Sequence, residues 1–126
     1  MPAEPVVKQA PVSIAGMRAG QLMLVPTTRM IAAFMAAIPA GESVSIHEMR
    51  QELARLWSAE VTCPIYTGYH LRTVAEAALE AHATGLPIEA ITPFWRVLDE
   101  ASPTTSRLPN GMAFVHERRA AEAPAG

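Results

Sequence analysis

The segment ITPFWRVLDE, at residues 91–100, holds the side chains in this sequence that could best form a binding site. Phe94 and Trp95 are adjacent large aromatics, and an aromatic face can stack on any nucleobase with about 1–3 kcal/mol per base. Arg96 follows them and could bind an anion or hold a loop through backbone carbonyls. Alternatively, both rings fill a pocket and belong to the core. The size of Phe94 slightly favours the core, and we expect a structural role for Arg96.

Cys63 is the single cysteine, so the chain can form neither an internal disulfide nor a cysteine-rich metal site. It precedes Pro64 near the start of an expected helix, a position that can lower a thiol pKa and activate the sulfur. His70 is close in sequence, but nothing in the sequence turns it towards the thiol. We therefore expect a buried structural cysteine, and we predict no metal site and no cofactor.

The composition suits one folded domain. Half of the 126 residues are hydrophobic, which is enough for a compact core. The net charge of −2 gives no overall attraction to nucleic acid or to an acidic membrane. No apolar run approaches the roughly 20 residues that span a bilayer, and the N-terminus lacks the pattern of a secretory signal. We therefore predict a cytoplasmic protein with no membrane partner.

The ends of the chain differ from its middle. Residues 1–20 contain several prolines among alanines and glycines, which predicts a disordered N-terminal arm. The same composition predicts a flexible tail at 123–126. The folded domain is expected to cover residues 21–122.

Apolar periodicity and capping residues predict two helices in the first half of this domain. The first begins at a cap formed by Thr27 or Thr28 and ends at 39–41, which reads Pro-Ala-Gly. The second begins at Ser45, which has the capping-box spacing with Glu48. Its apolar residues form one stripe, as in an amphipathic helix.

A third helix is expected after a short irregular piece, with Thr62 as its cap and Pro64 in its first turn. Residues 91–98 favour a strand because they are rich in aromatic and β-branched side chains. A loop at 99–111 and a closing helix at 112–122 complete the prediction. The predicted fold is mainly α with a small β element, in a single domain like a winged helix-turn-helix.

Three segments resemble, in the correct order, the DNA-binding domain of six-O-alkylguanine-DNA alkyltransferases. PAGESVSIHEMRQELA is similar to the family's Pro-x-Gly-x-Val-x-Thr-Tyr-Gly-x-Ile-Ala segment, and TGYHLRTVAEAA to its Arg-Ala-Val-Gly-x-Ala recognition helix. ITPFWRVLDE is similar to the active-site segment Ile-Pro-Cys-His-Arg-Val. The resemblance covers about residues 22–122.

The resemblance implies a protein that binds double-stranded DNA in the minor groove and flips out an alkylated base. The arginine that fills the resulting gap would be Arg72, although the 22 residues from Arg72 to Phe94 exceed the family's usual span and require an insertion. Thr67, Tyr69 and His70 would lie near the start of the recognition helix and donate to phosphates. The base pocket would be lined by the residues aligned with the family's site: Ile46, Phe94, Trp95 and Arg96.

Two departures from the family pattern decide the expected activity. Phe94 stands where the acceptor cysteine would be, and a benzene ring has no nucleophilic atom. Trp95 stands where the assisting histidine would be, and an indole N–H is not a base. The resemblance therefore implies a non-enzymatic, alkyltransferase-like protein that binds DNA, alkylated guanine included, and marks it for a repair-protein partner.

An alternative is a winged-helix scaffold that has lost DNA binding and mediates protein–protein or self-association. Glu76 and Glu80 on the expected recognition helix favour it, and Arg72 could simply pair with Glu76 on the helix surface. Residues 26–117 contain six arginines and no lysine against ten acidic residues. Since phosphate neutralisation supplies much of the affinity for duplex DNA, binding requires these arginines to cluster on one face.

Overall fold

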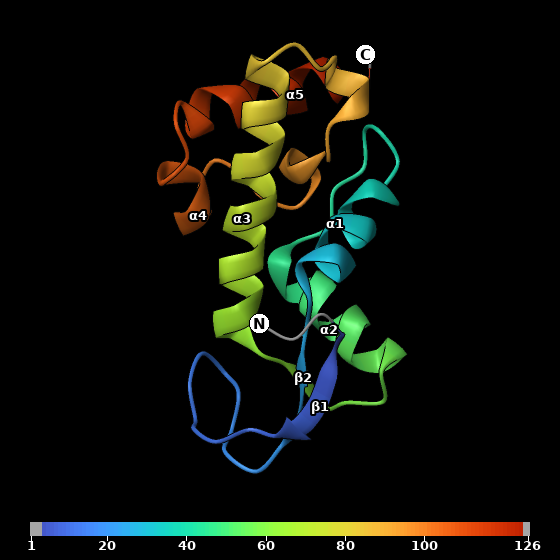
Figure 1. The fold of residues 1–126 in the computed structure, drawn as a ribbon, viewed down its shortest axis with the longest axis vertical. Helices are drawn as coiled ribbons and strands as arrows, with labels where there is room; N and C mark the ends of the chain where they lie inside the picture. Colours follow the sequence, from blue (N-terminus) through green and yellow to red (C-terminus); the bar gives the residue numbers. More distant parts are fainter. Residues whose placement is uncertain (1–3, 125–126) are drawn as a thin grey trace.

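A computed structural model of the chain describes residues 4–124. The protein is mainly helical with a small β component, as the sequence predicted, and that component is a three-stranded sheet (Figure 1). Two 3-10 turns follow the longest helix. In chain order the elements are β1 (Val6–Gln9), β2 (Leu22–Val25), α1 (Thr28–Ala36), α2 (Ile46–Leu56), β3 (Val61–Thr62), α3 (Pro64–Ala83), the 3-10 turns Ile88–Ala90 and Phe94–Arg96, α4 (Pro103–Ser106) and α5 (Gly111–Glu122).

The disordered arm predicted for residues 1–20 is not found in the part of it that the structure describes. β1 pairs antiparallel with β2, with Val6 opposite Val25, and β2 pairs parallel with β3. Ala10 and Met17 are buried against this sheet. The prolines flank β1 instead of interrupting it, so the backbone groups of the strand remain free to pair. Residues 1–3, and residues 125–126 of the predicted tail, lie outside the described residues.

The predicted helix starts are confirmed in α1 and α2. The Thr27 hydroxyl accepts a hydrogen bond from the Met30 amide at 3.1 Å. Ser45 and Glu48 form the reciprocal capping box, in which each side chain accepts from the other residue's amide. These caps serve amide groups that have no partner inside the helix.

The start of α3 is only partly as predicted. Pro64 occupies the first turn, but the capping residue is Cys63, whose side chain makes no capping bond. Thr62 instead belongs to β3, and its hydroxyl donates to the Arg50 carbonyl at 2.7 Å. The Arg50 guanidinium returns two bonds to the Thr62 carbonyl. This exchange ties the start of α3 to α2 and leaves Thr62 unavailable as a cap.

The strand predicted for 91–98 is not formed. Phe94–Arg96 is a 3-10 turn, and its aromatic residues are fully buried together with Val97 and Leu98. Aromatic and β-branched residues favour strands because they pack well on a half-buried surface, and here the core supplies that packing without a sheet. The predicted loop at 99–111 contains α4, and the predicted closing helix is α5.

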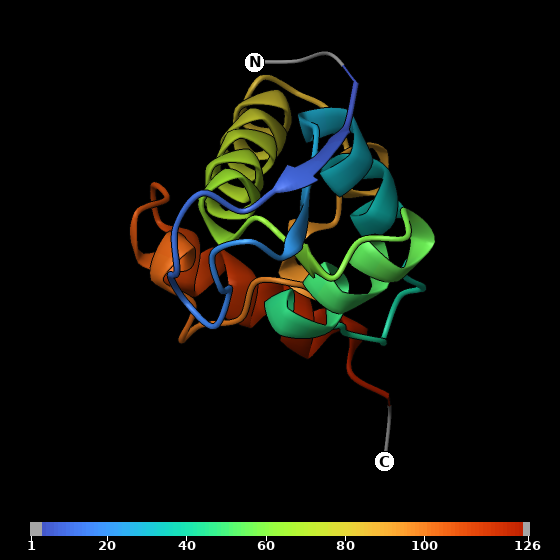
Figure 2. The same cartoon turned by 90° about the horizontal axis from the view of Figure 1, so that it is seen from below.

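α3 runs lengthwise through the molecule, with α1 and α2 on one side, α4 on the other, and α5 crossing behind one end of α3 (Figures 1 and 2). Its inner face packs against α1 and against the Phe94–Arg96 turn. None of the helices within residues 4–124 is both long and apolar enough to cross a bilayer.

Candidate functional site

The outer face of α3 carries the exposed residues of the predicted DNA interface. Tyr69 is 58% exposed, and Ile65 and Tyr66 are exposed beside it. Arg72 lies one turn further along and its Nε donates to Glu76 Oε1 at 2.7 Å. About half of each side chain in this pair is exposed. We name Ile65, Tyr66, Tyr69 and Arg72 together the α3 outer face.

Thr67 and His70 lie on the inner side of the same helix. The side chains of Thr67 and His70 are almost completely buried. The Thr67 hydroxyl donates to the Cys63 carbonyl at 2.6 Å. Their positions do not support the predicted contacts with phosphates, because their polar groups are already bonded inside the protein. The helical spacing could have predicted this burial. Thr67 and His70 lie four residues before Leu71 and Val74, so they continue the buried apolar stripe of α3.

His70 joins α3 to the chain segment that precedes α1. Its Nε2 lies 3.0 Å from the Pro26 carbonyl, and its Nδ1 lies 2.7 Å from the Thr28 hydroxyl. A carbonyl can only accept, so Nε2 carries the proton, and in the neutral imidazole Nδ1 accepts from the Thr28 hydroxyl. Burial lowers the pKa of His70, against a smaller raising effect of the Pro26 carbonyl. The lowered pKa and the two internal hydrogen bonds are typical of a structural histidine.

Phe94 and Trp95 belong to the core. Phe94 stacks on Phe114 of α5 with ring centres 5.6 Å apart, and meets the Trp95 ring edge-on at 5.5 Å. Neither aromatic side chain is more than 1% exposed. Ile46, at the start of α2, is half-buried and packs against the same core. Both rings therefore belong to the core, which is the alternative given in the sequence analysis, and no nucleobase can reach Phe94 in this conformation.

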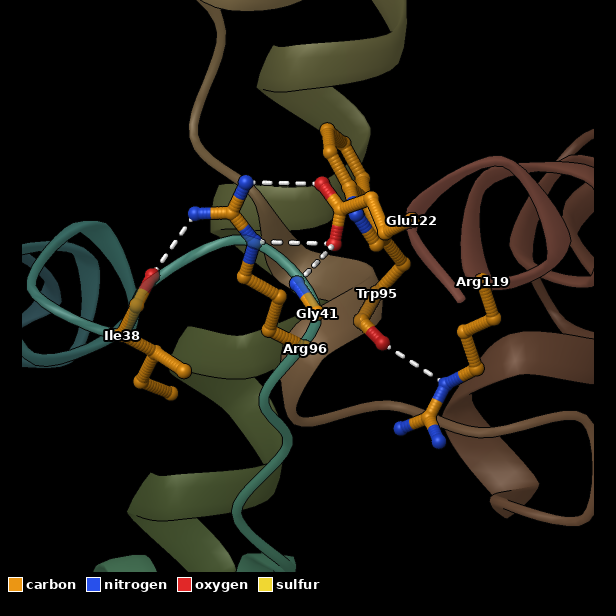
Figure 3. A network of polar contacts seen from close by, with 6 residues as sticks. All are labelled: Ile38, Gly41, Trp95, Arg96, Arg119 and Glu122. Atoms are coloured by element: carbon orange, nitrogen blue, oxygen red, sulfur yellow. Dashed lines mark hydrogen bonds and ion pairs between the residues drawn. The ribbon is translucent and has the colours of Figure 1, made fainter. Parts of the chain in front are cut away.

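Arg96 has the structural role that the sequence favoured. Two of its nitrogens donate to the Glu122 carboxylate at 3.1 and 2.7 Å, and a third donates to the Ile38 carbonyl at 2.7 Å (Figure 3). The Gly41 amide also reaches Glu122, at 3.5 Å. We name this group of Arg96, Glu122, Ile38 and Gly41 the Arg96 junction, since it joins the ends of α1 and α5 to the 3-10 turn.

The junction lowers the pKa of Glu122, first through the hydrogen bonds from Arg96 and against the opposing effect of burial. The Trp95 indole N–H faces this carboxylate and contributes to the lowering, although it does not reach hydrogen-bonding geometry. Arg119 completes the surroundings by donating from Nε to the Trp95 carbonyl at 2.7 Å (Figure 3). Sequence reasoning missed Glu122 and Arg119 because no local pattern links residues 26 and 24 positions apart.

Cys63 is buried, as expected, in a small cluster with residues of the sheet and the N-terminal segment. Phe94 belongs to the separate main core. The thiol therefore does not share a cleft with the aromatic rings, and His70 bonds to Pro26 and Thr28 instead of facing it. No three His, Cys, Asp or Glu side chains within residues 4–124 gather closely enough to hold a metal ion.

Two clefts flank these elements. One of about 450 Å³ lies between α3 and the start of α5, and its walls include Glu76, Glu80 and Phe114. A larger one, of about 570 Å³, opens beside Trp95, and none of its lining residues belongs to α3. The cleft on the α3 side is thus acidic at its rim, which disfavours an anionic ligand there.

Comparison with known proteins gives no match for this chain: no family model, no curated protein and no solved structure is similar to it. The resemblance to alkyltransferases therefore depends on the three sequence segments alone.

Proposed function

We propose that this protein is a non-catalytic, alkyltransferase-like DNA-binding protein that contacts duplex DNA, alkylated guanine included, through the α3 outer face. The observation that carries the proposal is the exposure of Tyr69 and Arg72 on one face of the long helix that follows the capped helix α2. The resemblance aligns this helix with the recognition helix of the family. In that alignment the buried Phe94 occupies the acceptor position.

The proposal contains no alkyl transfer. Transfer needs a nucleophilic atom at the bottom of an open base pocket and a base that activates it. Phe94 supplies neither an attacking atom nor space, because it stacks on Phe114 with no exposed surface. The function therefore consists of recognition, with a repair-protein partner acting on the bound DNA.

In the proposed function, α2 and α3 correspond to the helix-turn-helix, and α3 is the helix that contacts DNA. No strand follows α3 within residues 4–124, so a wing built from later strands has no counterpart there. Contacts with DNA must then come mainly from α3 itself and from the segments beside its N-terminal half. We expect a small interface with few phosphate contacts.

The Arg72–Glu76 pair does not prevent such a contact. An exposed ion pair of this kind contributes only about 0–1 kcal/mol, because water and salt screen it. A phosphate can therefore replace Glu76 as the partner of Arg72 at little cost. With one or two phosphates neutralised, the affinity is expected to be modest and to fall with salt at a log–log slope of about −1 to −2.

Fluorescence anisotropy with duplexes that contain or lack one six-O-methylguanine, at low and moderate salt, tests this proposal. We expect binding at low salt, tighter to the modified duplex, and a loss of that preference in Arg72→Ala. Arg55→Ala is the matched control, since Arg55 is an exposed arginine in an ion pair within α2. A dissociation constant above about 100 μM at low salt would sink the proposal, because even nonspecific DNA binders usually bind more tightly.

A second candidate function is protein–protein or self-association through the same face. Ile65, Tyr66 and Tyr69 expose apolar surface together, and Glu76 and Glu80 add negative charge further along α3. Aromatic residues with an acidic flank suit a protein surface better than a phosphate backbone. Analytical ultracentrifugation separates the two: a dimer that dissociates in Tyr69→Ser, together with no DNA binding, favours association.

A further inference from the structure

The cleft of about 570 Å³ beside Trp95 has the size of a small-molecule site. Its walls come from the end of α1, the segment 88–93 and the last turns of α5, and α3 contributes none of them. Ala36, Ala40 and Ile88 make part of the wall apolar, and Arg118 and Glu89 are among its charged residues. The cleft is therefore independent of the proposed DNA interface.

Arg118 is the arginine of this region that lacks an acceptor. Arg96 is bonded to Glu122 and Ile38, and Arg119 to the Trp95 carbonyl. Within residues 4–124, the Arg118 side chain forms no ion pair and no hydrogen bond, and its Nε is enclosed without an acceptor. Its guanidinium carbon lies 5.3 Å from the centre of the Trp95 ring, which holds the charge beside the cleft without supplying an oxygen.

The Trp95 indole nitrogen is the second enclosed donor without a partner, and Trp95 also lines the cleft. The indole N–H faces the Glu122 carboxylate, whereas Arg118 is given no acceptor by the described residues, and enclosed polar groups are almost always paired in folded proteins. The charged residues that line the cleft are Arg96, Arg118, Glu89 and Glu122, and Glu122 is already paired with Arg96.

We propose that this cleft binds a small monocarboxylate, with the carboxylate on the terminal amino groups of Arg118 and an apolar body against the alanine and isoleucine walls. A planar carboxylate matches the two parallel donors of a guanidinium. A phosphate dianion fits less well, because Glu89 and Glu122 also line the cleft and would repel its second charge. Two kinds of ligand carry such a carboxylate: a free organic acid and the carboxyl terminus of a peptide.

The indole N–H signals of the 15N-labelled protein provide the readout. There are two tryptophans: Trp95 lines the cleft, and Trp57 is an exposed residue at the end of α2. We expect benzoate to shift the Trp95 signal until saturation and to leave that of Trp57 unchanged. Benzamide, which has the same shape without the charge, and inorganic phosphate are expected to shift it far less. A short peptide with a free carboxyl terminus, compared with its amide, distinguishes the two sources of the carboxylate.

Variants assign the effect to Arg118. Arg118→Gln is expected to weaken benzoate binding about tenfold or more, and Arg118→Lys several-fold, because lysine keeps the charge and loses the paired donors. Arg107→Gln, an exposed arginine outside the cleft, is the control. A dispersed Trp95 signal without ligand shows that each variant is folded, and the benzamide comparison in the unaltered protein needs no variant. Equal shifts with benzamide and benzoate, no saturable shift of Trp95, or unchanged binding by a folded Arg118→Gln or Arg118→Lys would overturn the proposal.

Discussion

Two arginine–carboxylate pairs in this protein have the same closest distance and different surroundings. Arg72 and Glu76 on the α3 outer face approach to 2.7 Å, as do Arg96 and Glu122 in the Arg96 junction. The side chains of the first pair are 51% and 48% exposed, and those of the second are 16% and 11% exposed. Water and ions screen the first pair and largely spare the second.

The pairs also differ in what they connect. Arg72 and Glu76 are one helical turn apart, so their contact adds nothing to the tertiary structure. Arg96 connects a carbonyl 58 residues earlier with a carboxylate 26 residues later. The junction is therefore part of the framework, whereas the α3 outer face holds a cation that a ligand can take over.

The largest effect is expected at the aromatic residue beside the junction. Phe94→Ala removes a ring that has no exposed surface and contacts both Trp95 and Phe114. We expect the free energy of unfolding to fall by about 3–5 kcal/mol, because the lost burial is joined by the cost of a cavity. Urea denaturation followed by circular dichroism measures it. A loss below about 1 kcal/mol would mean that Phe94 lines an open pocket instead of filling one.

Breaking the Arg96 junction is expected to cause the second-largest loss of stability. Glu122→Gln leaves the half-buried Arg96 charge without its carboxylate, and we expect a loss of about 2–4 kcal/mol in the same assay. Glu52→Gln is the matched control, since it breaks an exposed pair with Arg55 and should cost no more than about 0.5 kcal/mol. Equal losses in the two variants would remove the distinction between framework and surface pairs.

Acid should act on the same pair. The pKa of Glu122 is lowered in the folded protein, chiefly by Arg96, so the folded state favours the ionised carboxylate. This stabilisation is complete above the ordinary glutamate pKa of about 4.3 and is lost as the pH falls through the lower folded value. The stability difference between the unaltered protein and Glu122→Gln is therefore expected to shrink on acidification below about pH 4. A difference independent of pH would contradict this assignment.

A smaller effect, at higher pH, is expected from His70. Its pKa is lowered, mainly by burial, so the folded protein binds the proton less readily than the unfolded chain. The contribution of neutral His70 to the free energy of unfolding is fully present above the unfolded histidine pKa of about 6.5. It decreases as the pH falls towards the folded pKa, by at most about 1.4 kcal/mol per pH unit. Urea midpoints between pH 7 and 5 should therefore fall more steeply for the unaltered protein than for His70→Gln. Parallel curves would show that His70 does not titrate in this way.

The sequence predicted those parts of the fold that local chemistry determines. The caps at Thr27 and Ser45, the proline at the start of α3 and the closing helix each depend on residues within a few positions of one another. β1 and the 3-10 turn Phe94–Arg96 were not predicted. β1 exists because it pairs with β2, and the turn is set by the burial of its rings among α3 and α5.

The candidate site shows the same limit. Tyr69 and Arg72 are exposed, but Thr67 and His70, which were expected to face DNA because they lie near the start of the aligned recognition helix, are buried. Their bonds go to Cys63, Pro26 and Thr28, and the last two are more than 40 residues away in the chain. The cleft beside Trp95 could not be predicted, because three segments distant in sequence form it.

The smallest expected effect on stability belongs to the α3 outer face. Arg72→Ala breaks an exposed pair within one helix, and alanine favours the helix, so the free energy of unfolding should change by no more than about 0.5 kcal/mol. The losses of unfolding free energy in Arg72→Ala and Glu122→Gln compare an exposed ion pair with a largely buried one at the same contact distance. A loss above about 1 kcal/mol would place Arg72 in the framework. Any accompanying loss of DNA binding would then reflect a disturbed fold, so a neutral result here is what allows the anisotropy experiment to be interpreted as a test of contact.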